Sequence, residues 1–276
     1  MKKLADTITR VGLVANPEKE SSRELVTAAI AFIEKSGRAA LVDDDMAKLA
    51  KSADLIMVFG GDGTMLRVAR EIAGSNTPIV GINTGSLGFL TDVQAHQLSQ
   101  ALDEIWAGKT QLETRPLIEA IGPSFTKLAL NDFVITRGPL PRLIELDVAV
   151  NGEAFTRYRC DGLIVCSPTG STAYSLAAGG AIISPDAEVF AITPICPHTL
   201  SNRSVIIGLN STIMVKPLSE RVETILSADG QPPTKLAAGD EITIRRSRHD
   251  IRLLHLAGSS FFDTLRRKLG WRGATV

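Results

Sequence analysis

A run of glycines around one carboxylate is the most chemically suggestive feature of this 276-residue sequence. The run Gly60-Gly61-Asp62-Gly63-Thr64 directly follows the apolar segment 55–59. Glycine lets a backbone turn sharply and lets phosphate oxygens approach its N–H groups, and the positive end of a following helix attracts anions. The run therefore predicts a phosphate-binding turn. Its contacts would come from Gly60, Gly61, Gly63 and Thr64.

Asp62 is the unusual member of this run, because phosphate repels a carboxylate. Asp62 either takes part in the chemistry, by accepting a proton or holding a metal ion, or caps the following helix, as Thr64 also could. Arg67, one turn further on, either meets an anion or lies on a solvated helix face. The run has neither the Gly-Lys-Ser/Thr of a Walker A loop nor the G-x-G-x-x-G of a dinucleotide fingerprint.

Three further segments carry polar groups of the kind that bind nucleotides. Segment 81–88 contains three glycines and is either a turn or a second backbone wall of the same cleft. Asn131-Asp132 is either an Asx turn or a ligand of a ribose or amide. Segment 167–180 is rich in hydroxyls and holds one of the two tyrosines. It either hydrogen-bonds a nucleobase or forms an N-cap followed by a small-residue helix over 172–178.

The first third of the chain alternates segments typical of strands and helices. Strands are expected at 8–15, 39–42, 55–59 and 79–82, and helices over 21–36 and 65–73, where apolar residues recur at three and four. This order predicts a Rossmann-like α/β domain with a parallel sheet. Such sheets bind ligands just beyond the carboxyl ends of their strands, which is where the glycine-rich run lies.

Beyond Pro116, short segments typical of strands follow one another. They are 117–121, 133–136, 143–150, 154–158, 163–166, 204–207, 212–215, 223–227, 241–245 and 252–256. Asn151-Gly152 between two of them favours a two-residue hairpin, and the whole pattern predicts a β-sandwich-like domain. Segment 259–269 is expected to be an amphipathic helix that returns to the first domain. We therefore divide the chain into an α/β domain, 1–115 plus 258–276, and a β-rich domain, 116–257.

Composition excludes several classes of function. The 30 basic and 30 acidic residues give a formal net charge of zero, so nothing indicates binding to nucleic acid or to an anionic membrane. No apolar segment approaches the ~20 residues of a membrane span, and the first residues lack the apolar core of a signal peptide. Cys160, Cys166 and Cys196 form no C-x-x-C pair, which favours reduced thiols. We expect a cytoplasmic protein.

Taken together, the motifs resemble those of the NAD kinase family, specifically its bacterial branch. GGDGT at 60–64 is shared with lipid kinases and phosphofructokinases. The narrower motifs are GINTGSLGFL at 81–90, ALND at 129–132, DGLIVCSPTGSTAYSLAAGG at 161–180 and PHTLSNR at 197–203. The resemblance covers most of the chain and implies transfer of the γ-phosphate of ATP to the 2′-hydroxyl of the adenosine ribose of NAD, giving NADP and ADP.

The resemblance also implies roles for individual residues. Asp62 would be the catalytic proton acceptor, with Gly63 beside the ribose. Asn131 and Asp132 would meet the adenylate half of NAD, although the family commonly has Asn-Glu there, so the contact of the shorter side chain is reset or bridged by water. The full NAD-binding set that we assign is Asp62, Gly63, Arg67, Asn131, Asp132, Arg142, Arg159, Asp161, Thr172, Ala173, Tyr174, Ser175, Leu176, Ala177 and Gln231.

Within this set, Thr172 to Ala177 would hold the adenine, and Arg159 and Asp161 would face the nicotinamide half. Arg159 would place a cation near the nicotinamide ring, whose charge differs between NAD and NADH, and we hypothesise a preference for NAD. The resemblance implies Mg²⁺ or another divalent ion as cofactor, carried mainly by ATP and alternatively also by Asp62. Inorganic polyphosphate is an alternative donor. Family members are homodimers or homotetramers.

Two other functions share part of this pattern. A lipid kinase would share Gly60 to Thr64 but has no need of the adenine loop 172–177, and it should bind membrane. A non-catalytic NAD sensor would keep the binding residues but would not need Asp62. The presence of both features favours the NAD kinase.

Overall fold

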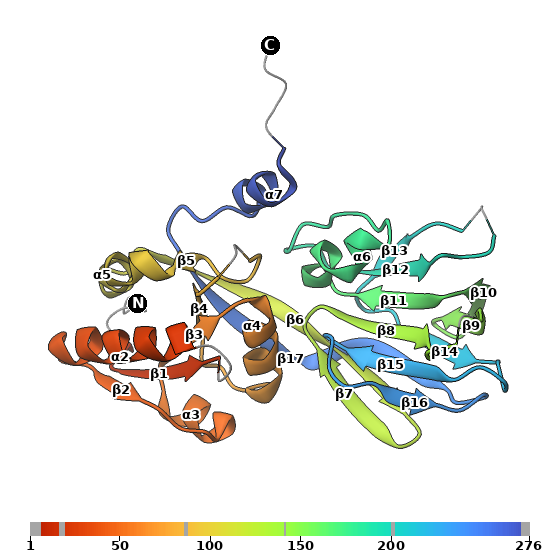
Figure 1. The fold of residues 1–276 in the computed structure, drawn as a ribbon, viewed down its shortest axis with the longest axis horizontal. Coiled ribbons are helices and arrows are strands. Elements are labelled where there is room, and N and C mark those ends of the chain that lie inside the picture. Colours follow the sequence, from red (N-terminus) through yellow and green to blue (C-terminus); the bar gives the residue numbers. More distant parts are fainter. Residues whose placement is uncertain (1–6, 17–19, 86–87, 141, 200–201, 272–276) are drawn as a thin grey trace, which may run out of the picture. The chain divides into compact units, whose positions relative to one another are not determined.

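The apolar segments of the first 114 residues form the parallel sheet that their patterning predicts (Figure 1). The computed structural model describes residues 7–16, 20–85, 88–140, 142–199 and 202–271, and the chain forms two units, residues 1–114 with 250–276 and residues 115–249. In the first unit the strands lie in the order β2 (Ala39–Leu41), β1 (Arg10–Ala15), β3 (Leu55–Gly60) and β4 (Ile79–Asn83). Strands β5 (Val93–Gln94) and the end of β17 (Ile242–Leu256) also pair in parallel with β4.

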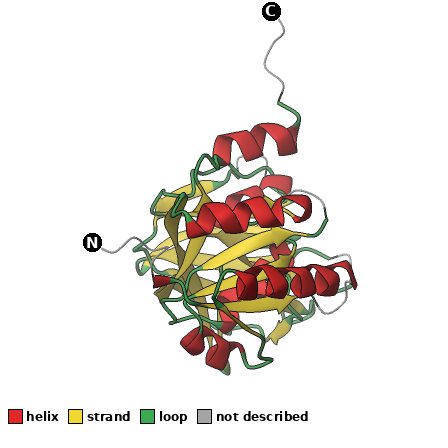
Figure 2. Cartoon of the chain, turned by 90° about the vertical axis from the view of Figure 1, so that its left-hand side faces the viewer, coloured by secondary structure: helices red, strands yellow, loops and turns green. Residues whose placement is uncertain are grey.

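Helices cover both faces of this sheet (Figure 2). Helices α2 (Glu20–Lys35) and α5 (Leu98–Trp106) share a core with Val11 and Leu13 of β1. Because successive strand residues point to opposite faces, Gly12 faces the other layer, where Leu49 of α3 (Met46–Ser52) would be a near neighbour of an added Cβ atom. Helix α4 (Asp62–Glu71) contacts both α3 and β3. The three layers confirm the expected α/β fold.

The C-terminal helix α7 (Phe261–Leu269) belongs to this same unit, as expected. The Oγ atom of Ser260 accepts the N–H of Asp263, which caps its first turn, and Gly270 ends it with a φ of 66°. Leu265 is buried, whereas Phe262 is 60% exposed. The apolar stripe of α7 is therefore only partly covered within this unit.

The second unit contains two antiparallel sheets around one core. One sheet has the order β13-β12-β11-β8-β15-β16, and in the other β10, β9, β14 and β17 follow one another, with β6 beside β17 and β7 beside β6. The bounds are β6 Thr110–Gly122, β7 Phe125–Ala129, β8 Asp132–Arg137, β9 Ile144–Val150, β10 Glu153–Cys160, β11 Gly162–Cys166, β12 Val189–Ile195, β13 Val205–Gly208, β14 Ile213–Pro217, β15 Thr224–Ala228 and β16 Thr234–Leu236. Phe133 and Leu163 of the first sheet share the core with Leu146 and Ile213 of the other. This arrangement confirms the expected sandwich-like domain.

Two expectations about the strands need correction. Segments 241–245 and 252–256 are not separate strands, because β17 runs without interruption from Ile242 to Leu256. Residues 250–257, which our division assigned to the second domain, lie in the first unit, since Leu253 pairs there with Ile79 of β4. The expected hairpin at Asn151-Gly152 is confirmed, with φ values of 54° and 83°.

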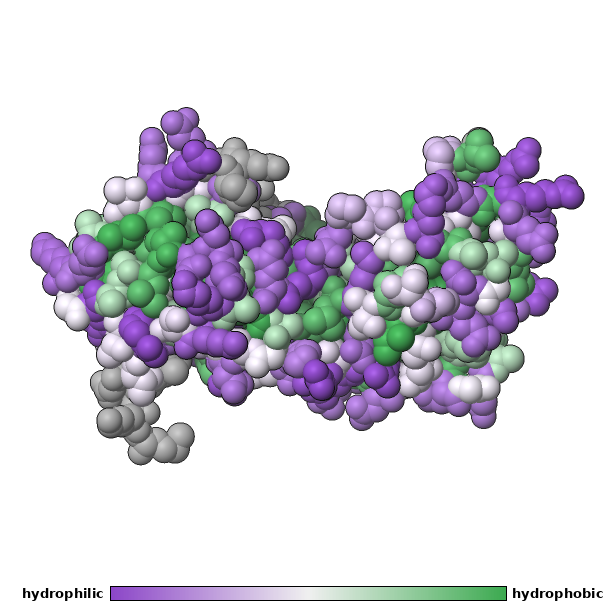
Figure 3. All heavy atoms as spheres, turned by 90° about the horizontal axis from the view of Figure 1, so that it is seen from below, coloured by the Kyte–Doolittle hydropathy of each residue, from purple (hydrophilic) through white to green (hydrophobic). Residues whose placement is uncertain are grey.

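The surface mixes polar and apolar side chains. On the face drawn in Figure 3, hydrophilic residues are interspersed with hydrophobic ones. Among the described helices, none combines the length and the apolar character that crossing a lipid bilayer requires.

Candidate functional site

The glycine-rich run forms the turn between β3 and α4. All six residues of β3 are buried, and Gly61, with extended φ and ψ of −112° and −170°, is the N-cap residue of α4. The N–H groups of Thr64 and Met65 both donate to the carbonyl oxygen of Gly61, at 3.0 and 3.2 Å. No side chain caps the helix there, and Asp62 is its first residue. The alternative that Asp62 or Thr64 serves as the cap is therefore wrong.

The glycines of this turn differ in what surrounds them. A Cβ atom at Gly60 would collide with the Thr64 side chain, so the close approach of strand and helix requires glycine. At Gly61 and Gly63, apart from neighbours in the chain, no atom of the described residues lies within 4 Å of the position that a Cβ would occupy. The described residues therefore leave space beside the main chain at these two glycines.

Asp62 joins the glycine-rich turn to the second predicted loop. Its Oδ2 atom accepts the N–H of Phe89 at 2.8 Å, and its Oδ1 atom accepts the N–H of Leu90 at 3.0 Å. A Cβ atom at Gly88 would collide with the same carboxylate, so glycine allows this approach. Asn83 Oδ1 accepts the N–H of Gly85 at 2.8 Å. Gly81 to Asn83 thus end β4, a bend follows at Thr84 and Gly85, and Gly88 to Leu90 lie against Asp62; Ser86 and Leu87 lie outside the described residues.

Arg67 lies on a half-exposed face of α4. Its Nη1 atom is 3.0 Å from Oε2 of Glu71, one turn further along the helix. The structure thus places Arg67 in an i,i+4 ion pair, as the alternative of a solvated helix face implies.

In the second unit, one unpredicted carboxylate organises the Asn131-Asp132 segment. Asp229 accepts the N–H groups of Leu130, Asn131 and Asp132, at 3.0, 2.8 and 3.2 Å. It lies in the hairpin turn after β15, with a φ of 47°, and Gln231 closes that turn by donating its N–H to the carbonyl oxygen of Ala228 at 2.9 Å. These bonds bring Asn131, Asp132 and Gln231 together. The sequence signal was the hairpin dipeptide Asp229-Gly230.

Asp132 is the most perturbed carboxyl group of this segment. Its side chain is buried, with the residue 4% exposed. Burial, and next the negative charge of Asp229, raise the pKa of Asp132 to about 7. The carboxyl group therefore holds its proton up to much higher pH than an ordinary aspartate.

The hydroxyl-rich segment packs directly on Asn131. The N–H of Ser167 donates to the carbonyl oxygen of Asn131 at 2.9 Å, and Ser167 Oγ donates to the carbonyl oxygen of Leu130 at 2.5 Å. A Cβ atom at Gly170 would collide with the carbonyl group of Asn131. The residues just before the predicted adenine loop thus lie beside Asn131, a predicted ligand of the adenylate half.

The helix expected over 172–178 is present only as a single short turn. A 3₁₀ turn, η2 (Thr169–Thr172), is followed by one short helical turn, α6 (Tyr174–Ala177). The chain breaks between them because buried hydroxyls on either side bind distant partners: Ser171 Oγ accepts the N–H of Ile183 at 3.0 Å, and Ser175 Oγ lies 3.0 Å from Thr193 Oγ1. Tyr174 is 46% exposed, whereas Ser175 is fully buried.

Asp161 is paired with an arginine that the sequence did not single out. Arg137 Nε is 2.8 Å from Asp161 Oδ1, and Arg137 Nη1 donates to the carbonyl oxygen of Leu140 at 3.0 Å. Arg142 donates its N–H to the same carbonyl group, at 2.8 Å. Arg159 is exposed on β10, in register with Glu145. The structure thus places Arg142 near the Arg137–Asp161 pair, whereas the Arg159 side chain has no part in that pair.

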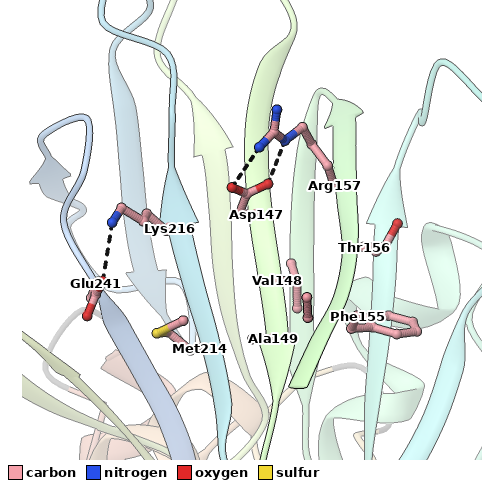
Figure 4. A pocket seen from close by; sticks show the side chains of 10 residues that line it. Asp147, Val148, Ala149, Phe155, Thr156, Arg157, Met214, Lys216 and Glu241 are labelled. Atoms are coloured by element: carbon pink, nitrogen blue, oxygen red, sulfur yellow. Dashed lines mark hydrogen bonds and ion pairs between the residues drawn. The ribbon is translucent and has the colours of Figure 1, made fainter. Parts of the chain in front are cut away.

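A hollow on the sheet formed by β9, β10 and β14 contains none of the predicted residues (Figure 4). Val148, Phe155 and Met214 line it together with the ion pairs Asp147–Arg157 and Lys216–Glu241. Its lining offers neither a glycine-rich main chain nor an unpaired acid, so it is a poor match to the predicted chemistry.

Within the described residues, no three His, Cys, Asp or Glu side chains are grouped as metal ligands. The three cysteines are free thiols, as expected. Burial raises the pKa values of Cys160 and Cys166 to about 12, so both remain protonated at neutral pH.

Comparison with known proteins agrees with these features. A model of the ATP-NAD kinase N-terminal domain matches residues 47–110, and one of the ATP-NAD kinase C-terminal domain matches residues 130–256. A protein named NAD kinase from Symbiobacterium thermophilum is 42% identical over 221 residues, which are 78% of each chain. Another from Desulforamulus reducens is 40% identical over 277 residues, covering 94% of this chain and 96% of the relative.

Solved structures are similar over almost the whole chain. A yeast NADH kinase complexed with NADH has a TM-score of 0.89 and 26% identity, over 98% of this chain and 89% of the other. An NAD kinase from Archaeoglobus fulgidus in complex with ATP has a TM-score of 0.80 and 26% identity, over 96% of this chain and 100% of the other. Because both domain models match in order and relatives of this identity match nearly the full length, the chain belongs to the NAD kinase family.

Proposed function

We propose that Asp62 accepts the proton of the adenosine 2′-hydroxyl when this kinase converts NAD and ATP to NADP and ADP. One observation carries the proposal. The Asp62 carboxylate begins α4 inside the glycine-rich turn, two main-chain N–H groups fix its plane, and the main chain beside it at Gly61 and Gly63 is open. Each carboxylate oxygen keeps a lone pair for an incoming proton.

The reaction forms a bond between the 2′ oxygen and the γ-phosphorus while the bond from that phosphorus to the ADP oxygen breaks. The hydroxyl proton passes to the Asp62 carboxylate. A positioned carboxylate contributes about 10²- to 10⁴-fold to such a transfer. Main-chain N–H groups of the turn at Gly60, Gly61, Gly63 and Thr64, together with the N-terminus of α4, would stabilise the negative charge of the transferred group.

The described residues fit a divalent ion that arrives with the nucleotide. They offer no protein cage of three ligands, and Mg²⁺ is commonly held by one or two carboxylates together with phosphate oxygens. Asp62 is the carboxylate that we assign to it, as the alternative to the role of proton acceptor. When bound, the ion would neutralise phosphate charge.

The NAD contacts other than those of Asp62 and Gly63 are assigned mainly to the β-rich unit, residues 115–249, and the phosphate chemistry to the first unit, residues 1–114 with 250–276. Support comes from the Asp229 bonds, which gather Asn131, Asp132 and Gln231, and from the packing of Ser167 on Asn131. Because the Ser175 side chain is buried, we assign its adenine contact to the main chain. The adenine contacts of this loop are Thr172, Ala173, Tyr174, Ser175, Leu176 and Ala177.

Three further properties belong to the proposal. Arg159, Asp161 and the nearby Arg142 would meet the nicotinamide half, with NAD preferred over NADH; equal kcat/KM values on both would contradict that preference. The protein would be a cytoplasmic homodimer or homotetramer that serves NADP biosynthesis, and light scattering would determine its mass in solution. ATP would be preferred over polyphosphate, which parallel assays with the two donors would decide.

The first test is a coupled assay on Asp62→Asn. NADP made from NAD, ATP and Mg²⁺ is read with an NADP-specific dehydrogenase. We expect the rate to fall by about 10²-fold or more, while calorimetry still detects binding of NAD and ATP. The matched control is Asp103→Asn, which changes an exposed aspartate of α5 and should leave the rate unchanged.

A titration with Mg²⁺ separates the two roles of Asp62. If Asp62 anchors the metal, the variant should need more Mg²⁺ and recover activity when the ion is in excess. If Asp62 accepts the proton, excess Mg²⁺ should restore nothing. Undiminished NADP formation by Asp62→Asn would overturn both roles.

A further inference from the structure

The C-terminal helix contacts the residue whose N–H group donates to Asp62. The ring of Phe261 in α7 lies 6.3 Å from the ring of Phe89, measured between centroids. Lys268, two turns further along α7, places its Nζ atom 5.5 Å from the centre of the same ring. Tilted aromatic pairs and cation–π contacts at these distances are attractive. All of these residues belong to the first unit.

Phe89 needs such support because its side chain is only half-buried. It differs in this from Leu90, whose side chain is 4% exposed and whose N–H group holds the other oxygen of Asp62. Both residues donate an N–H group to the Asp62 carboxylate. Leu90 is thus anchored by burial of its side chain, and Phe89 is anchored by its contacts with α7.

We propose that α7 positions the catalytic carboxylate: Phe261 and Lys268 hold the ring of Phe89, and the N–H of Phe89 holds Asp62 in the plane needed for proton transfer. This inference rests on the proposed role of Asp62. Phe261 touches no reacting atom in this scheme and is a positioning residue. When it is lost, Asp62 should turn away more often, which lowers kcat, while the binding contacts made by other residues keep KM unchanged.

The test compares Phe261→Ala with Trp271→Ala. Trp271 is an aromatic residue just beyond the same helix and is 54% exposed. Two quantities are measured, namely kcat with both KM values, and hydrogen exchange of the Phe89 and Leu90 amides by NMR without substrates. For Phe261→Ala we expect about tenfold faster exchange at Phe89 and about tenfold lower kcat, with KM within about twofold. Trp271→Ala should match the wild type.

If Phe261→Ala unfolds, two milder variants test the same contact. Phe89→Leu replaces the aromatic ring by an aliphatic side chain, and Lys268→Met replaces the charged side chain by an uncharged one of similar length. Wild-type exchange and kcat in these variants would overturn the inference, as would faster exchange with unchanged kcat, or an equal effect of Trp271→Ala. The proposed function fails separately: undiminished activity of Asp62→Asn removes the catalytic role of Asp62, whatever the exchange at Phe89 shows.

Discussion

Asp54 and Asp132 carry the same carboxyl group, yet their surroundings move its pKa in opposite directions. Partial burial alone would raise the pKa of Asp54, but hydrogen bonds from the Arg10 and Thr9 side chains and from their main-chain N–H groups hold it well below its ordinary value. For Asp132, burial and the neighbouring Asp229 carboxylate both act in the same direction, and they raise its pKa to about 7. One aspartate is built to stay charged and the other to hold a proton.

The raised pKa of Asp132 predicts how the free energy of unfolding changes with pH. In the unfolded chain this carboxyl ionises near pH 4, whereas in the folded chain it holds its proton until about pH 7. The folded state therefore loses relative stability as pH rises from 4 through 7. Asp132→Asn cannot ionise, so it should gain about 2 kcal/mol relative to the wild type between pH 5 and pH 8. Urea unfolding at both pH values measures this, and a difference that is the same at both would refute it.

His255, in the first unit, also has a raised pKa, but there the folded state favours the charged form of the side chain. Its imidazole is largely buried and bonded through Nδ1 to Asp92, and its Nε2 atom lies 2.8 Å from Oε2 of Glu113. Burial alone would lower the pKa of His255, but the two carboxylates raise it to about 9. Since this is above the ordinary value of 6.5, the stabilisation is complete below pH 6.5 and is lost as pH rises through 9.

Replacing His255 by Gln should therefore destabilise the protein most in acid. We expect a loss of about 2 kcal/mol in the free energy of unfolding at pH 6 and a smaller loss at pH 10. Thermal or urea unfolding at the two pH values checks this. His249→Gln, in the other unit, is the control with which the loss at each pH is compared. A pH-independent loss would mean that packing rather than charge supports His255.

At the scale of elements, the two predicted nucleotide segments differ in what holds them. The glycine-rich turn is set by local sequence, since β3, the glycines and α4 follow one another directly. The Asn131-Asp132 segment depends on a carboxylate 97 residues away, at Asp229. Local patterns therefore predicted the strand–turn–helix arrangement of the first segment, whereas the partner of the second segment could not be deduced from spacing.

Asp229→Ala tests this dependence. Without the carboxylate, the N–H groups of Leu130, Asn131 and Asp132 lose their acceptor, and we expect the KM for NAD to rise about tenfold or more. Steady-state kinetics at fixed ATP measures it. Asp240→Ala is the matched control, because Asp240 accepts one N–H, from Ala237, in another exposed turn. An unchanged KM in both variants would show that the segment needs no support from Asp229.

The errors in predicted elements have related causes. The helix expected over 172–178 is reduced to Tyr174–Ala177 because Ser171 and Ser175 bind partners on other segments, which helix propensity does not take into account. The break expected in β17 follows from its polar middle, but that polar stretch alternates with buried residues such as Ser247 and stays in the strand. Tertiary contacts override local pattern in both cases.

At the scale of the whole molecule, the order of the family motifs predicted the fold class and the family. It could not predict which residues support the assigned ones. These supporting contacts join segments that are distant in sequence. They are the ion pair of Arg137 with Asp161, the hydrogen bond from the Asn131 N–H to Asp229, and the hydrogen bond from the Phe89 N–H to Asp62. A motif identifies the groups that meet a ligand, whereas the groups that orient them are visible only in three dimensions.

The first unit is assembled from both ends of the chain, and this has a consequence during synthesis. A ribosome releases residues in order, so Asp62 and Phe89 emerge long before Phe261, which is 172 positions after Phe89. His255 likewise reaches Asp92 and Glu113 only after all the residues between them have been synthesised. A nascent or prematurely terminated chain would carry every residue of the GGDGT motif and still lack the support of its carboxylate. Until Phe261 has been synthesised, Asp62 would lack that support, and a chain without α7 should transfer phosphate more slowly than one that contains it.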